Sequence, residues 1–415
     1  ERLAVDFIDE YIEMVCLRNQ YAQKLGYQDF YDYKVQREDG MTKKELFAIF
    51  DTIYKKTKYA KANVKKLEKS MPGLRKPWNF GYMMAGDFIK EEDQFFQFDE
   101  ALMRWGTSFA ALGIDCKGGN LQLDLLDRQG KWNNGFCHWP DIVFFKNNKR
   151  FSGTSNFTCN VVYGQVGSGS EGLHTLFHEG GHAAHLLNCE QEDVCVNHEY
   201  APMSMAWAEM QSMFIEALFS SIEWRNRYAL NAKGEPYSFD LLERKMRKLN
   251  PLRPLALNGI MFVSNFEREV YEVKNLTAQK VKTIARKNYR KYFERSADSL
   301  LALSVTHIYS WESSGAYHGY GLAELAVTQW REYFYKKYGY IVDNPKVGAE
   351  MARVWALGAS KTFNEFVQIA TGKKLSADAL LKNITAPLAT IMQESKKKIL
   401  RLKKVKPYTK KIQLG

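Results

Sequence analysis

Apolar residues recur at helical spacing along most of the chain. Near its start, Ile8, Tyr11, Ile12 and Val15 fall on one face of a helix, because residues three, four and seven positions apart share a face. The same spacing continues to about residue 112, with breaks at Pro-containing pairs. Later helices are predicted over residues 173–187, 205–219, 239–249, 255–271, 278–293 and 299–305, and within residues 322–396.

The spacing changes to alternation after about residue 113. Leu121, Leu123 and Leu125 alternate with polar residues, and further strand-like segments follow, separated by Gly, Asn and Lys clusters. A period of two is typical of a half-buried strand. We therefore predict a small sheet of three or four strands within residues 113–170, with a flexible Gly-rich lead over residues 164–172 into the next helix.

The helix that follows carries His178, Glu179 and His182. Residues four apart in a helix are separated by roughly 6 Å on one face, so both imidazoles leave the same side. Two such His can bind one zinc ion, and the Glu beside them can act as general base. A buried helix whose His only satisfy hydrogen bonds is the alternative. Gly180 and Gly181 argue against it, because each is about 1 kcal/mol worse than Ala in a helix, which indicates close approach by a peptide or a neighbouring helix.

A zinc site of this kind needs a third protein ligand. The next predicted helix places Glu209, Ser212 and Glu216 on one stripe of an otherwise apolar surface. Carboxylates on an apolar face are costly unless they are paired or bind metal. We therefore expect Glu209 to be the third ligand and Glu216 to orient a ligand His. An ordinary buried ion pair is the alternative.

These two blocks and a third one resemble the thimet oligopeptidase and oligoendopeptidase F family of zinc metallopeptidases. The third block is a His followed by a Tyr-rich cluster, here His307, Tyr317 and Tyr320. Gly180 departs from the pattern, since the family often has a bulky apolar residue there. The resemblance covers most of the chain. It implies a mainly α, zincin-like, neurolysin-like helical fold with a small β-sheet preceding the metal-binding helix and a deep substrate channel.

The resemblance also implies an activity. One Zn²⁺ per chain would be held by His178, His182 and Glu209, and Glu179 would act as general base on the zinc-bound water. Short peptides would be the substrates of such a metallo-oligopeptidase. We expect endopeptidase action; dipeptidyl-carboxypeptidase action, or peptide binding without catalysis, is the alternative.

Other site residues follow from the same resemblance. Tyr320, Tyr317 and His307 would help to stabilise the transition state, with a Tyr-rich turn packed on the core as the alternative. Gly135 and Phe136 would bind substrate together with the two Tyr, or would only form a hairpin turn.

The expected regions are a helical lobe (1–112), a sheet region (113–170), catalytic helices with the Tyr/Gly loop (171–330), and C-terminal helices with a basic tail (331–415).

Composition limits the partners. The chain has 415 residues and a net charge of +12, much of it within residues 396–411. A charge run alone specifies no partner, and no nucleic-acid-binding motif accompanies it, so we expect a solvated surface and no nucleic acid. No apolar run reaches the ~18 residues of a membrane span, so we expect no membrane association. Of the six Cys, Cys189 and Cys195 flank a short loop and could form a disulfide, but we expect reduced thiols in a cytoplasmic protein. The oligomeric state, monomer or dimer, stays open.

Overall fold

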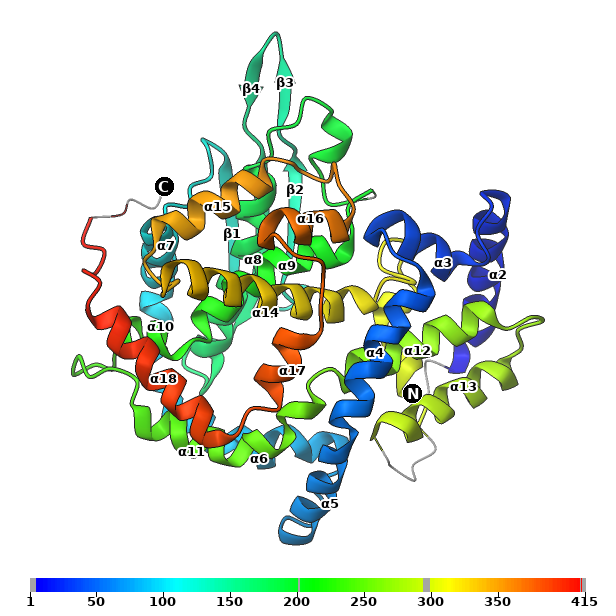
Figure 1. The fold of residues 1–415 in the computed structure, drawn as a ribbon, viewed down its shortest axis with the longest axis horizontal. Helices are drawn as coiled ribbons and strands as arrows, with labels where there is room; N and C mark the ends of the chain where they lie inside the picture. The colour runs from blue at the N-terminus through cyan, green and yellow to red at the C-terminus, as the bar shows by residue number, and fades with distance from the viewer. Residues whose placement is uncertain (1–4, 201, 294–298, 411, 413–415) are drawn as a thin grey trace.

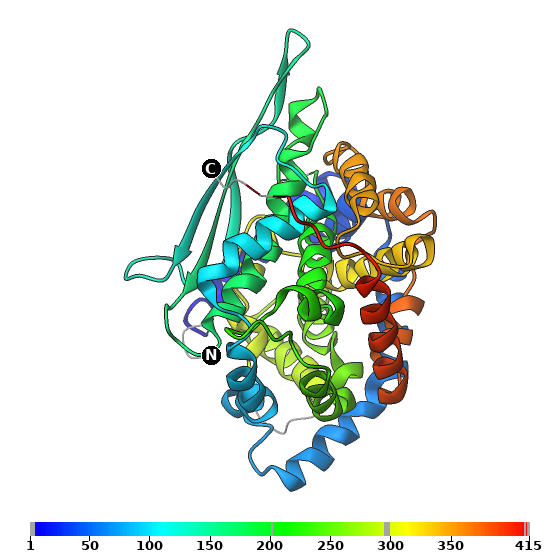
Figure 2. The same cartoon turned by 90° about the vertical axis from the view of Figure 1, so that its left-hand side faces the viewer.

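The computed structural model describes residues 5–200, 202–293, 299–410 and 412. This part of the chain is mainly helical, as predicted, and its strands lie together along one side of the molecule (Figures 1 and 2).

The helices before the strands are Ile8–Lys24 (α2), Phe30–Lys34 (α3), Lys43–Thr57 (α4), Lys61–Ser70 (α5), Pro77–Asp93 (α6) and Ala101–Leu112 (α7). The strands are Asn120–Leu126 (β1), Phe136–Asp141 (β2), Phe144–Lys146 (β3), Lys149–Phe151 (β4) and Thr154–Val161 (β5). The later helices are Ser168–Leu187 (α8), Met205–Phe219 (α9), Ile222–Tyr228 (α10), Phe239–Leu249 (α11), Asn258–Glu272 (α12), Ala278–Phe293 (α13), His318–Tyr338 (α14), Pro345–Trp355 (α15), Phe363–Thr371 (α16), Asp378–Ile384 (α17) and Leu388–Lys403 (α18).

The sheet has three strands in the order β1-β5-β2. The central strand β5 pairs in parallel with β1 and antiparallel with β2. Its buried side chains Phe157, Cys159 and Val161 alternate with half-buried ones, as expected for a strand with one face on the core. Helix α8 packs against this strand. Strand β2 is therefore at one edge of the sheet, which leaves one side of its backbone without a strand partner among the described residues.

The sheet predicted to have three or four strands has three among the described residues, and β3 and β4 form a separate hairpin. Its turn residues Asn147 and Asn148 have φ values of +52° and +59°. Asn tolerates this left-handed conformation, which a tight hairpin turn requires. The hairpin projects beyond the rest of the molecule (Figures 1 and 2).

The prediction of a flexible Gly-rich lead over residues 164–172 is wrong for its second half. Helix α8 already begins at Ser168, so Gly169 and Gly172 lie inside it and are not part of a flexible lead. A Cβ on Gly169 would clash with the carbonyl oxygen of Phe96, and a Cβ on Gly172 would lie 2.5 Å from Cγ2 of Val161. These glycines therefore let the helix pack closely against its neighbours.

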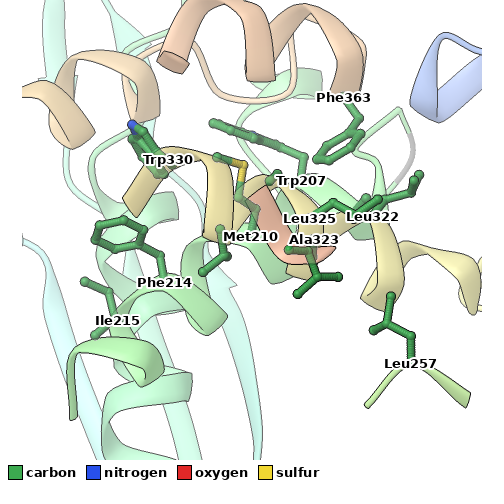
Figure 3. Packing of buried hydrophobic residues seen from close by; sticks show 14 of the residues in the cluster. Trp207, Met210, Phe214, Ile215, Leu257, Leu322, Ala323, Leu325, Trp330 and Phe363 are labelled. Atoms are coloured by element: carbon green, nitrogen blue, oxygen red, sulfur yellow. The ribbon is translucent and has the colours of Figure 1, made fainter. Parts of the chain in front are cut away.

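Helices α9 and α14 form the centre of the molecule. Helix α9 packs against both α8 and α14. Ser204 starts α9 by accepting hydrogen bonds from the backbone N–H groups of Ala206 and Trp207, as a good N-cap does. The apolar side chains at this contact, drawn in Figure 3, include Trp207, Met210, Phe214, Leu322, Leu325 and Trp330.

Two further observations bear on the expectations from composition. None of the helices among the described residues combines the length and hydropathy that a bilayer crossing requires. The cysteines are free, including Cys189 and Cys195.

The contact between α8 and α9 depends on Gly181. A Cβ there would lie 2.8 Å from Cα of Ser212 and 2.9 Å from the carbonyl oxygen of Gln211. Backbone atoms cannot move aside as a flexible side chain can, so the two helices would have to separate. One of the two mid-helix glycines thus accommodates a neighbouring helix, as predicted.

We expect Gly181→Ala to lower the free energy of unfolding by about 1–3 kcal/mol, the usual cost of overpacking. The matched control is Gly81→Ala in α6, where a Cβ meets no atom within 4 Å and where Ala gains up to about 1 kcal/mol of helix propensity. Urea denaturation of both variants measures the difference. Equal stability of the two would show that the helix contact tolerates a methyl group.

Candidate active site

Three side chains from α8 and α9 converge on one point. His178, His182 and Glu209 each offer a ligand atom, and these atoms lie within 4.8 Å of one another. Oε2 of Glu209 is 3.4 Å from Nε2 of His178 and 3.7 Å from Nε2 of His182. Two imidazole nitrogens and one carboxylate oxygen are a common donor set for a catalytic divalent metal ion, with a further position left for water or substrate. The residues present therefore fit a metal ion.

The carboxylate of Glu216 holds the ring of His178. Its Oε2 is 2.9 Å from Nδ1 of His178, so the opposite ring nitrogen faces Glu209. Such a partner fixes the tautomer and orientation of a metal-binding imidazole. The other oxygen of Glu216 is 3.0 Å from Nε2 of His174. Sequence reasoning missed His174, although it precedes His178 by four residues and so had to share its face of the helix.

Burial and neighbouring charges set the protonation of these groups. Burial alone would raise the pKa of Glu209, but hydrogen bonding to His178 and the nearby imidazoles bring it to about 2. Burial lowers the pKa of His182 to about 4, against the opposing effect of Glu209. Glu209 is thus ionised and His182 neutral near pH 7, the forms in which both can bind a metal ion.

Glu179 lies in the cavity beside this cluster. Its side chain is largely buried, and burial raises its pKa to about 7, with Glu209 and Glu216 adding to the rise and His178 opposing it. A carboxylate with a pKa near the working pH is suited to accept and return a proton. The site thus places a side chain suited to act as a general base beside a set of side chains that fits a metal ion.

The cavity has a volume of about 610 Å³. One wall is the edge strand β2, with Phe136, Cys137, His138 and Trp139. The loop before this strand also lines the cavity, and a Cβ on Gly135 would lie 2.7 Å from Cγ2 of Thr175 and 3.3 Å from Oε1 of Glu179. The two candidate substrate-binding residues, Gly135 and Phe136, therefore lie beside the candidate base.

Another part of the cavity lining comes from the third sequence block. The hydroxyl of Tyr320 lies 3.1 Å from Nε2 of His307, and both residues line the cavity. Tyr317 packs edge-on against both rings, at centroid distances of 5.2 Å and 5.3 Å, without lining the cavity among the described residues. This block was predicted to be a loop throughout, but α14 begins at His318. Tyr320 is therefore fixed in the first turn of a long helix.

A buried network behind this part of the lining was not predicted. His318 Nε2 is 2.7 Å from Oδ2 of Asp39, and its Nδ1 is 2.9 Å from the hydroxyl of Tyr31. Ser204 donates to the other oxygen of Asp39 at 2.6 Å. Asp39 thus links the start of α14, which carries Tyr320, to the N-cap of α9, which carries Glu209. No local pattern could reveal a contact across 279 positions.

Comparison with known proteins bears on this site. The model of peptidase family M3 matches residues 116–386, well over half of the chain. Comparison with curated protein sequences gives no significant match.

Solved structures share the fold. An M32 carboxypeptidase from Deinococcus radiodurans R1 is 14% identical with a TM-score of 0.62, over 94% of this chain and 75% of that one. PZ peptidase A with an inhibitor is 18% identical with a TM-score of 0.64, over 95% of this chain and 66% of that one. A protein provisionally named oligoendopeptidase F is 17% identical with a TM-score of 0.61, also over 95% and 66%. The chain thus spans about two thirds to three quarters of the length of these structures.

We expect Glu216→Gln to weaken metal binding by about 10–100-fold, the usual effect of losing a carboxylate that orients a ligand imidazole. Competition with a chelator, followed by elemental analysis, measures this affinity. His174→Gln is the matched control, because it removes the other contact of Glu216 and leaves the contact to His178 intact. Unchanged metal affinity in Glu216→Gln would show that His178 needs no such support.

Proposed function

The chain belongs to peptidase family M3, and on that premise we propose that it is a zinc-dependent oligopeptidase that cleaves short peptides internally. The observation that carries this proposal is the convergence of His178, His182 and Glu209 beside Glu179 in one cavity. A donor set of two imidazoles and a carboxylate is typical of catalytic zinc.

The side chains of the cavity include a candidate for each role that peptide hydrolysis requires. Zinc, when bound, would polarise the scissile carbonyl group and lower the pKa of the attacking water. Glu179 takes a proton from that water and passes it to the leaving nitrogen. Tyr320 donates a hydrogen bond to the carbonyl oxygen as negative charge develops on it. Burial and the nearby Glu209 raise the pKa of the Tyr320 hydroxyl well above its ordinary value, so it keeps its proton.

An extended substrate can be held by strand β2. This strand lines the cavity and is at the edge of the sheet, so its free backbone groups can pair with a peptide by strand addition. The resulting contacts depend on the peptide backbone and not on side chains. This supports an enzyme that accepts many sequences, provided that the substrate is unfolded and short.

Two other modes of action remain for the same site. The solved structures that share the fold include a protein named as a carboxypeptidase, and a dipeptidyl-carboxypeptidase would use the same metal and base. These modes differ in their products. Mass spectrometry of the products from one peptide, with its C-terminus free or amidated, separates internal cleavage from removal of C-terminal residues.

We expect Glu179→Gln to retain zinc and to lower kcat/KM on a quenched peptide by about 10²–10⁴-fold, the usual contribution of a general base. Zinc content is measured by elemental analysis on the same preparation. Glu171→Gln is the control, because Glu171 lies on the same helix and lines the same cavity but is exposed. Loss of zinc together with activity would make Glu179 a ligand or a structural residue, and full activity would remove it from the mechanism.

A further inference from the structure

A second cavity of about 780 Å³ lies beside the first one. Helices α9, α14, α17 and α18 line it, together with Arg253 from the segment before α12. These helices lie near one another in Figure 1. The sequence did not indicate this cavity, and the mechanism above makes no use of it.

Two helices connect the cavities. On α9, Glu209 lines the first cavity, Glu216 lines both, and Ser220 lines the second. Glu216 and Ser220 are seven and eleven positions after Glu209, so the three residues form one stripe along the helix. The two cavities therefore meet at Glu216.

Helix α14 repeats this arrangement. Tyr320 lines the first cavity, whereas Glu324 and Arg331 line the second. Glu324 and Arg331 are four and eleven positions after Tyr320, so the three residues share a face of the helix. A peptide that leaves the metal cluster along these helices therefore enters the second cavity.

The helix geometry gives the distance. Arg331 is eleven residues beyond Tyr320 on α14, which corresponds to about 16 Å along the helix axis. An extended peptide advances about 3.3 Å per residue. A substrate side chain or terminus that reaches Arg331 is thus about five residues from the bond that is cleaved.

Two cations that line the second cavity, Arg331 and Lys398, form no ion pair among the described residues. Nη1 of Arg331 is buried and donates to no acceptor among the described residues, and its guanidinium lies over the rings of Phe214 and Tyr335. Lys398 places its ammonium 4.2 Å from the ring centroid of Tyr335, and burial lowers its pKa against the opposing effect of the nearby Glu223. Neither cation forms an ion pair with a described residue. A buried donor left without an acceptor costs free energy that a bound anion would recover.

Most carboxylates around this cavity are already engaged. Glu216 contacts two imidazoles, Glu332 is 3.7 Å from Lys382, and Glu394 is 2.8 Å from Lys397. The other lining carboxylate among the described residues is Glu324, whose pKa is raised by burial and by Glu216 and lowered by Arg331. The excess of unpaired donors therefore favours an acceptor group as ligand.

We propose that the second cavity is a substrate subsite in which Arg331 and Lys398 bind a carboxylate about five residues from the scissile bond. This inference rests on the proposed peptidase function and adds a substrate class to it, namely peptides with an acidic side chain or a free C-terminus at that distance. The fork of a guanidinium group matches the two oxygens of a carboxylate. Arg253, which donates to the side-chain oxygens of Asn250 and Asn383, completes the basic lining.

The test compares peptides that differ in one carboxylate. A peptide reaching about six residues beyond the cleaved bond on each side carries either Glu or Gln at the distal positions, with its C-terminus free or amidated. We expect the wild-type protein to cleave the forms with a distal carboxylate with about tenfold or higher kcat/KM, the effect of one charge-assisted hydrogen bond. Loss of this advantage on amidation identifies the terminal carboxylate, and loss on Glu→Gln identifies the side chain.

Variants assign the preference to the cavity. Arg331→Gln and Lys398→Gln should each remove most of the advantage of the distal carboxylate and leave cleavage of a short neutral peptide unchanged. Lys382→Gln is the matched control, because Lys382 lines the same cavity but is exposed and already paired with Glu332; it should keep the preference. Binding of the same peptides to Glu179→Gln, measured by fluorescence anisotropy, should follow the same order without turnover.

Three results would overturn the proposal. These are equal rates on the Glu and Gln peptides, equal losses on long and short peptides in both variants, and a preference for distal Lys, which would make Glu324 the binding group. Failure of the proposed function looks different, since no peptide would be cleaved by the zinc-loaded wild-type protein. The two ideas can therefore fail separately.

Discussion

The close approach of α8 to α9 is the constraint on which the site depends. A helix supplies two imidazoles on one face from residues four apart, and here the third candidate ligand comes from a different helix. Glu209 comes from this second helix, and its oxygen lies 3.4 Å and 3.7 Å from the two His nitrogens only because α9 lies almost in backbone contact with α8. Gly181 makes that contact possible, at the cost of a poor helix former in mid-helix. Gly181 lowers the helix propensity of α8, but without it α9 could not come close enough to place Glu209 beside the two His.

The free-energy cost of burying charged groups is the second constraint. The chain lowers this cost because each buried carboxylate contacts more than one partner. Glu216 accepts from His174 and His178, and Glu209 contacts His178 and His182 as well as the hydroxyl of Ser212. A single carboxylate in this position would be strongly disfavoured by desolvation. The array of alternating imidazoles and carboxylates lowers that cost and at the same time holds each ring at a fixed angle. Stability and metal binding therefore draw on the same contacts, which explains why the polar stripe of α9 can lie in the centre of the molecule.

The sequence predicted what is local and missed what is distant. The His spacing, the Glu stripe and the alternation of Leu121, Leu123 and Leu125 in β1 follow from the periods of helix and strand, so they were visible in the sequence alone. The start of α14 at His318 was not, because a segment rich in Gly, Ser and Tyr carries a weak helical signal. Its position is set by tertiary contacts, in which His318 bonds to Asp39 and Tyr31 from the far end of the chain. The second cavity was hidden for the same reason, since Arg331 and Lys398 come from separate helices.

Helices α9 and α14 show how core and site can be built from the same elements. Each has an apolar side, with residues such as Phe214 and Trp330 packed between the helices (Figure 3). Each also has a polar stripe, which begins at Glu209 or Tyr320 and continues into the second cavity. A straight helix keeps a stripe in line over many turns, so the rigid core that fixes the catalytic groups also fixes any more distant substrate contact at a set spacing from them. Selection of a substrate by the distance between its cleaved bond and a distant group requires this rigidity, because a flexible connection would blur that distance by several residues. The packing of the two helices therefore sets the spacing between the candidate catalytic groups and the proposed carboxylate subsite.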